Sequence, residues 1–197
     1  MTDAWRTAPT LVGRYVTLRP LRVEDKDALV SVAAGDDLWD LFYASVSQLK
    51  DADRWLAATL AQVEQGRALV FAVCDPAGRV VGTTRFMRMN AGHRRLEIGG
   101  TFYATAVQRT GVNTEAKRML LAHAFDVLGC QCVQIRTDAL NIRSQRAIER
   151  LGAKKDGVLR GHQIVGRRLR DSFVYSILDR EWPGVRQNLD YLLERHA

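Results

Sequence analysis

The sequence predicts a mixed α/β fold of the α+β kind, in which helices flank a central, mostly antiparallel sheet of about seven strands. Segments with strand-like patterns outnumber those with helical spacing, and turns rich in glycine and proline join neighbouring strands into hairpins. No low-complexity linker divides the 197 residues, of which 47% are hydrophobic. We therefore expect one domain over residues 1–197.

The first elements follow from local pattern. Residues 14–19 alternate in polarity and end at Pro20, which suits a strand. A helix is expected over about residues 23–33, because acidic side chains occupy its first turn, where the helix dipole favours them. A second helix is expected over residues 51–65, with Gly66 just past its end.

The clearest hairpin joins strands at residues 69–74 and 79–89. Its turn, residues 75–78 (DPAG), contains a proline that presets one dihedral angle and a glycine that supplies the left-handed one. The next strand, at residues 95–103, runs into a short loop and then a helix over about residues 113–128, which carries an apolar stripe.

The C-terminal part contains two helices and three strands. We expect a buried strand at residues 131–139 and a short helix at residues 141–151. A pair of strands is expected at residues 153–161 and 171–178, and a terminal helix at residues 181–195. Together with the earlier hairpin, this order indicates a mixed sheet with helices around it.

Composition excludes several classes of protein. The formal charge of +7 fits nucleic acid, an acidic protein surface or a polyphosphate-bearing cofactor. No basic run is interleaved with aromatic residues, so we expect no nucleic-acid partner. No apolar run approaches the roughly 20 residues of a membrane helix, and the N-terminus lacks a secretory layout. We expect a cytoplasmic protein with no membrane partner. We also expect no bound metal, because its three cysteines lack histidines at zinc-ligand spacing.

The most informative window is residues 97–115. A strand that runs into a tight loop and then a helix presents several backbone N–H groups and the positive end of the helix dipole at one point. Such a point can bind a pyrophosphate, with Gly111 allowing close approach and Arg109 supplying positive charge. The alternative is a plain junction that needs a glycine for its turn.

Two segments resemble one family. Residues 108–113 (QRTGVN) resemble the Q/R-x-x-G-x-G/A acetyl-coenzyme A loop of the GCN5-related N-acetyltransferase (GNAT) superfamily, with Asn113 in place of the second glycine or alanine. Residues 141–153 (NIRSQRAIERLGA) resemble the N-x-x-S-x-x-x-x-E-x-x-G-A segment of its ribosomal-protein-alanine acetyltransferase (RimJ/RimL-like) branch. The resemblance covers nearly the whole chain.

The resemblance implies the GNAT fold, in which the sheet splays at a bulge in its fourth strand and the pantetheine arm of acetyl-CoA lies in the gap. The glycine pair Gly99-Gly100 independently suits such a bulge. The implied cofactor-binding residues are Phe102, Tyr103, Gln108, Arg109, Thr110, Gly111, Val112, Asn113, Thr114, Asn141, Arg143, Ser144 and Arg146. Arg143 and Arg146 could equally be solvated helix charges.

The implied reaction is direct transfer of an acetyl group from acetyl-CoA to a primary amine, on a protein N-terminus or a small molecule. Glu97 is the first candidate for the base, directly or through water, and Asp138 is the second. The alternative for Glu97 is an ion pair with one of Arg85, Arg94 or Arg95.

Two further roles complete the expected site. The backbone N–H at about Tyr103 is expected to contact the oxyanion. In many relatives a tyrosine protonates the departing thiolate, but Ile148 occupies the matching place here, and Ser144 is the nearest hydroxyl on that helix. A helix-start hydrogen bond is an equal reading of Ser144.

The acceptor is less defined. His93, His162, Arg167, Arg168 and Arg170 form a positive rim that hints at an acidic acceptor, although such rims are usually solvated surface. The departures at Asn113 and Ile148 motivate a second reading, in which the chain is a non-catalytic coenzyme A-binding sensor or interaction module. A homodimer is a further expectation, because relatives commonly dimerise.

Overall fold

Eight strands form one sheet in residues 3–35, 40–41, 43 and 45–195, which the computed structural model describes. Their order is β1-β2-β3-β4-β5-β6-β8-β7, and within these residues only the β5–β6 pair is parallel. The strands are β1 Leu11–Val12, β2 Thr17–Pro20, β3 Ala68–Cys74, β4 Val80–Asn90, β5 Arg95–Tyr103, β6 Cys132–Asp138, β7 Lys154–Val165 and β8 Arg168–Leu178. The predicted mixed, mostly antiparallel sheet is confirmed, with the two-residue β1 as an unpredicted addition.

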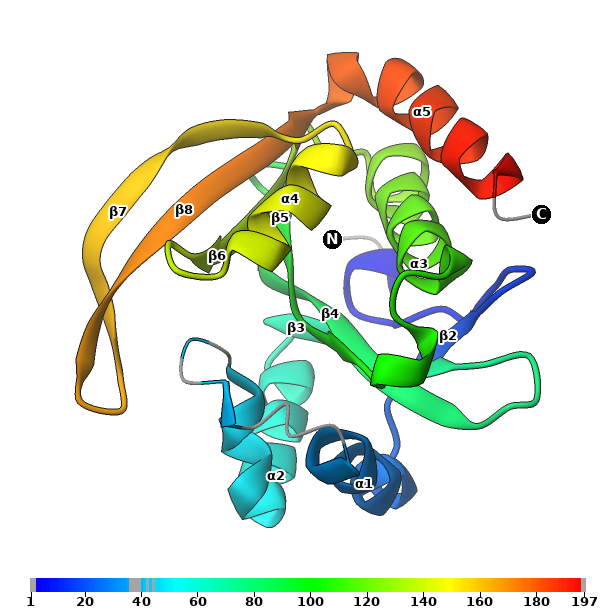
Figure 1. Ribbon diagram of the computed structural model, residues 1–197. Coiled ribbons are helices and arrows are strands. Elements are labelled where there is room, and N and C mark those ends of the chain that lie inside the picture. The colour runs from blue at the N-terminus through cyan, green and yellow to red at the C-terminus, as the bar shows by residue number, and fades with distance from the viewer. Residues whose placement is uncertain (1–2, 36–39, 42, 44, 196–197) are drawn as a thin grey trace.

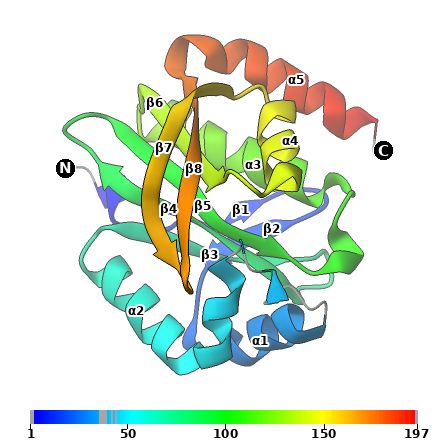
Figure 2. The same cartoon turned by 60° about the vertical axis from the view of Figure 1, so that its left-hand side comes forward.

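Helices cover both faces of the sheet. Figures 1 and 2 show α1 and α2 on one face, and α3, α4 and α5 on the other. The α-helices are α1 Lys26–Gly35, α2 Ala52–Glu64, α3 Gly111–Ala122, α4 Ile142–Arg150 and α5 Trp182–Glu194. The short helical turns are η1 Asp3–Trp5, η2 Val23–Asp25, η4 Ser45–Asp51, η5 Thr105–Val107, η6 His123–Val127 and η7 Asp179–Glu181.

Each face of the sheet has its own apolar core. On the α1/α2 face, Leu29, Leu49 and Trp55 pack with Phe102 of β5. Tyr103, the next residue of β5, belongs to the larger core under α3 and α5. This alternation is the normal consequence of a strand buried on both faces, and it brings both cores to the same end of β5.

The fourth predicted strand, β5, contains the expected bulge. Thr83 lies opposite Phe102 and Arg85 opposite Gly99, so β5 carries one more residue than β4 across this interval. Gly100, within the bulge, has a φ of +55°, a left-handed conformation that favours glycine.

Beyond the start of β5 the sheet splays. Residues Arg95–Glu97 pair with Cys132–Gln134 of β6, whereas the later residues of β6 pair with β8 and not with β5. The two strands therefore part after Glu97. The predicted splay is confirmed, and its cause is the short register shared by β5 and β6.

The last two strands are longer than predicted. Strands were predicted only over residues 153–161 and 171–178, but β7 and β8 continue to a turn at Gly166, where φ is +62°. Ile164 and Leu169 near this turn are 77% and 65% exposed, so the hairpin end has no buried face to give a clear alternation. The hairpin tip reaches toward the side that carries α2 (Figures 1 and 2).

Candidate active site

A cleft of about 830 Å³ opens where β5 and β6 part. One side of it is formed by the loop before α3 and by α4, and the other by η4, α2 and the β7–β8 hairpin. Of the predicted site residues, Glu97, Phe102, Tyr103, Gln108, Arg109, Thr110, Asn113, Asn141, Arg143 and Ser144 line the cleft. Within the described residues, Gly111, Val112, Thr114 and Arg146 are not part of its lining.

The loop before α3 directs the helix N-terminus at this cleft. The hydroxyl of Thr110, the N-cap, accepts a hydrogen bond from the Val112 N–H at 3.3 Å and donates one to the Val107 carbonyl at 2.6 Å. Arg109 has a φ of +62°, an uncommon conformation for a residue with a side chain. With Arg109, Thr110 and Asn113 all on the cleft, the first turn of α3 offers backbone donors and positive potential to an anion.

Gly111 has a packing role that the sequence did not indicate. A Cβ at this position would lie 2.8 Å from the ring of Tyr15, on the N-terminal segment. The close contact with Tyr15 is therefore a reason for the glycine that is independent of any bound phosphate. A substitution at Gly111 would disturb this packing as well as any bound ligand.

Gln108 ties β5 to α4. Its Nε2 donates to the Tyr103 carbonyl at 2.8 Å, and its Oε1 accepts from Nη2 of Arg143. The Ala104 N–H donates to the Val81 carbonyl on β4 at 2.8 Å, so the alternation of an antiparallel ladder turns the backbone groups of Tyr103 away from β4 and toward the gap. Arg146, by contrast, is exposed and lies outside the cleft lining.

The start of α4 is held by its own cap. Oδ1 of Asn141 accepts a hydrogen bond from the Ser144 N–H at 3.0 Å, which is an N-cap contact. Ser144 thus takes part in the helix-start hydrogen bond through its backbone. Ile148 is buried on the cleft wall. Arg150 at the far end of α4 donates to the Thr114 hydroxyl at 2.9 Å and fixes α4 against α3.

Both candidate bases are carboxylates paired with two arginines. Glu97 is 4% exposed, and Nη1 of Arg88 lies 2.9 and 3.0 Å from its two oxygens, while Nε of Arg136 lies 3.1 Å from one of them. The ion pair that was the alternative reading of Glu97 is therefore present, but with Arg88 and Arg136 in place of Arg85, Arg94 or Arg95. Asp138, 1% exposed, pairs with Arg168 and, at 3.7 Å, with Arg170.

Lys117 is a cleft residue that sequence reasoning missed. It is 7% exposed, and its Nζ donates to the hydroxyls of Thr101 and Thr84 at 2.8 and 3.3 Å. No carboxylate in the described part of the chain pairs with it, and burial lowers its pKa to about 7. The available signal was a lysine three and four residues before Leu120 and Leu121, on the apolar side of α3.

The histidines divide between structure and cleft. His123 is buried and stacked on Phe86, with ring centroids 6.0 Å apart, so it is a structural residue. His162 lines the cleft, and one ring nitrogen lies 3.0 Å from the Ser172 hydroxyl. Burial, and after it the positive charges of nearby arginines, lowers the pKa of His162. His93 lies in the exposed turn between β4 and β5.

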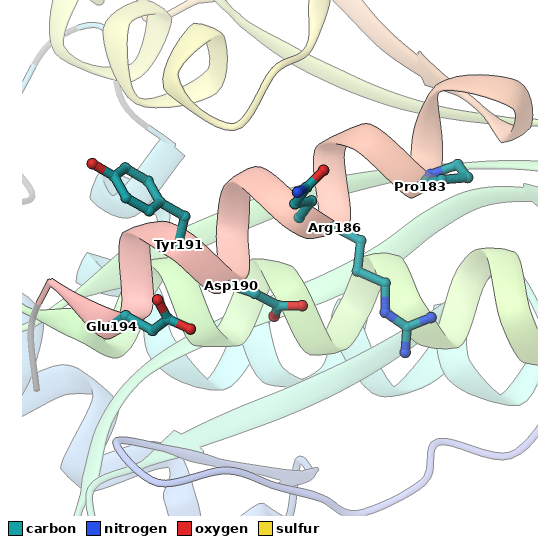
Figure 3. Close-up of a pocket in the computed structure, with 6 residues that line it drawn as sticks. Pro183, Arg186, Asp190, Tyr191 and Glu194 are labelled. Carbon is teal, nitrogen blue, oxygen red and sulfur yellow. The ribbon is translucent and has the colours of Figure 1, made fainter.

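A second hollow, of about 400 Å³, lies on α5. All of its lining residues come from that one helix, and the labelled side chains in Figure 3 fan out from it rather than converge.

In the described residues, no helix is long and apolar enough to cross a membrane, and no group of three metal-ligating side chains is found. The cleft between β5 and β6 is therefore the candidate active site.

Comparisons with known proteins agree with this geometry. The sequence model of the acetyltransferase (GNAT) domain matches residues 16–154. A GCN5-related N-acetyltransferase from Brucella melitensis is 31% identical, with a TM-score of 0.83 over 94% of this chain and 85% of that one. RimJ of Mycobacterium smegmatis, solved in complex with CoA-disulfide, is 21% identical with a TM-score of 0.78 over 96% of both chains, a likeness of fold alone. The uncharacterized N-acetyltransferase p20 of Bacillus licheniformis is 24% identical over 179 residues, 89% of this chain and 99% of that protein.

Proposed function

Since the chain belongs to the acetyltransferase (GNAT) family, we propose that it transfers the acetyl group of acetyl-CoA directly to a primary amine. The acceptor is a small molecule or a protein N-terminus. The observation that carries the proposal is the gap between β5 and β6, which opens beside the N-terminus of α3.

The residues of the cleft fit acetyl-CoA. Backbone amides from Arg109 to Thr114 would bind the pyrophosphate. Those in the first turn of α3 have no carbonyl partner within the helix, although the Val112 N–H also donates to the Thr110 hydroxyl. The pantetheine arm would lie beside the outward backbone groups of Tyr103 and near Phe102. Arg143 would meet the far end of the cofactor, and the amide of Asn113 can donate to a phosphate oxygen.

The reaction needs little covalent help from the protein. The amine nitrogen attacks the thioester carbonyl carbon, a C–N bond forms, the C–S bond breaks, and coenzyme A leaves as thiolate. Glu97 takes the amine proton, directly or through water. The Tyr103 N–H stabilises the oxyanion, and the Ser144 hydroxyl is the proton donor nearest to the thiolate on α4.

A coenzyme A-binding sensor with the same fold is the competing function. Release of free thiol from acetyl-CoA in the presence of candidate amines supports the enzyme. Binding of acetyl-CoA without any acetylated amine, over a broad panel of peptides and small amines, supports the sensor.

Asn113→Asp tests the phosphate loop without disturbing the contact between Gly111 and Tyr15. A carboxylate at this position should weaken acetyl-CoA binding by about tenfold or more, because it faces the pyrophosphate at short range. The matched control is Asn90→Asp at the end of β4, where Oδ1 accepts the His93 N–H and an aspartate can do the same. Equal affinities of the two variants in titration calorimetry would refute the placement.

A further inference from the structure

The end of the cleft that faces α2 and the β7–β8 hairpin has an excess of positive charge. Five arginines lie on it or next to it: Arg85, Arg88, Arg136, Arg168 and Arg170. Among the described residues only two carboxylates accompany them. Glu97 pairs with Arg88 and Arg136, and Asp138 pairs with Arg168 and Arg170. Guanidinium donors therefore outnumber the carboxylates available to them.

Arg85 is the arginine without a carboxylate partner in the described chain. Its Nε is buried with no hydrogen bond, and its guanidinium carbon lies 5.9 Å from the centroid of the Trp55 ring. A Cβ on Gly100 would lie 2.5 Å from this Nε, so the bulge glycine makes room for the arginine. Burying a guanidinium costs several kcal/mol unless an anion pairs with it.

The position of Arg85 separates it from the proposed cofactor loop. Trp55 belongs to α2, on the face of the sheet opposite α3 (Figure 1), and Arg85 packs on that side. Arg88, Arg136 and Arg170 line the same cleft as His162 of the hairpin, and after burial their charges lower the pKa of that histidine. An acceptor that enters from the α2 side therefore meets cations before it meets the thioester.

We propose that the acceptor amine carries a carboxylate or a phosphate, and that Arg85, held between Trp55 and Gly100, binds this anion. The inference rests on the proposed acetyl transfer. Arg85 is a specificity residue in this account. It orients the amine toward the thioester by holding the opposite end of the acceptor.

Pairs of amines that differ only in the anion test the proposal. O-phosphoethanolamine is compared with ethanolamine for the phosphate, and alanine with alaninamide for the carboxylate. At least one anionic member should show a kcat/KM about tenfold or more above its neutral partner, since hydrogen bonds between charged groups are strong. This advantage should fall as salt is added.

Arg85→Met should reduce that advantage to less than about threefold while leaving the KM for acetyl-CoA unchanged, and Arg85→Lys should restore part of it. Arg79→Met, in the exposed β3–β4 turn, is the matched control. Equal rates for both members of each pair in the wild-type enzyme overturn the proposal, and so does a preference that survives Arg85→Met.

Binding separates this inference from the proposed function. Acetyl-CoA affinity is measured first, without an acceptor. A protein that does not bind acetyl-CoA would count against the proposed cofactor site and not against the role of Arg85. If no amine is acetylated, the four amines are titrated into the protein saturated with coenzyme A. Binding of an anionic member alone supports the role of Arg85, and binding of none overturns it.

Discussion

Lys117 keeps its side-chain amine in a buried position between α3 and the bulge of β5, where, among the described residues, it donates hydrogen bonds to the hydroxyls of Thr84 and Thr101. Burial lowers its pKa from 10.5 to about 7. Between these values the unfolded chain binds the proton and the folded chain does not, so stability rises with pH across this window. Below pH 7 both states are protonated and the full cost of burial remains.

Lys117→Met should therefore stabilise the fold most at pH 7 and below, by up to roughly 4 kcal/mol, and least near pH 10. Urea unfolding at pH 7 and at pH 9.5 measures the difference. Lys154→Met, in the exposed pair with Glu181, is the control for loss of a lysine charge. A gain at Lys117 that is the same at both pH values would contradict the buried, uncharged lysine.

Glu97 and His162 both line the cleft, and we propose Glu97 rather than His162 as the base. Glu97→Gln should lower kcat about 100-fold or more, with an unchanged KM for acetyl-CoA, because a general base contributes that much. His162→Gln should cost less than about tenfold on the same scale. The opposite ranking would transfer the base role to His162, and circular dichroism of both variants checks that the fold survives.

The loop before α3 and the position of Glu97 in β5 could be predicted from sequence, because both depend on order along the chain. The partners of Glu97 could not. Arg88 has a φ of +49° where β4 and β5 lose register between Met87 and Asn90, and this irregularity carries its side chain to Glu97. A bulge without a glycine leaves little trace in sequence.

At the scale of elements, α3 is anchored to the N-terminal segment by one carboxylate. Glu115 accepts the backbone N–H groups of Arg14, Tyr15 and Val16 at 2.8, 2.6 and 2.9 Å. A Cβ on Gly13 would lie 2.4 Å from this carboxylate. The segment therefore wraps closely around Glu115 and holds Tyr15 against Gly111, the first residue of α3.

Glu115→Gln should destabilise the protein by about 1–3 kcal/mol. A glutamine side chain has only one acceptor oxygen, and its NH2 group would face a backbone N–H group that needs an acceptor. Denaturant unfolding gives the value. Glu64→Gln, on an exposed position of α2, removes the same charge without a backbone partner and should leave stability nearly unchanged. If the two variants unfold alike, the anchor has no energetic role.

Most elements were predictable because their apolar periodicity matches one buried face. The exceptions have physical causes. The hairpin end of β7 and β8 projects from the sheet and exposes both faces, so alternation did not mark residues 162–170. The last turn of the predicted helix over 113–128 is a π-helix from His123 to Val127, since the chain widens there after α3 ends at Ala122.

At the scale of the whole molecule, the sheet separates two approaches to one cleft. The loop before α3 reaches it from the face with α3, α4 and α5, while Trp55 and Arg85 reach it from the face with α2 (Figures 1 and 2). The parting of β5 and β6 connects them. The parting of β5 and β6 follows from strand register across the sheet, which no local stretch of sequence encodes. The splay of the sheet was predicted only through the family resemblance.

In the proposed site, the first turn of α3 binds the diphosphate of acetyl-CoA beside the open edge of β5. A crystal structure of the protein with coenzyme A tests it most directly. We expect phosphate oxygens within hydrogen-bond distance of the amides of residues 109–114, and pantetheine running along Tyr103 between β5 and β6. A diphosphate bound elsewhere, with this turn in contact with solvent only, would contradict it.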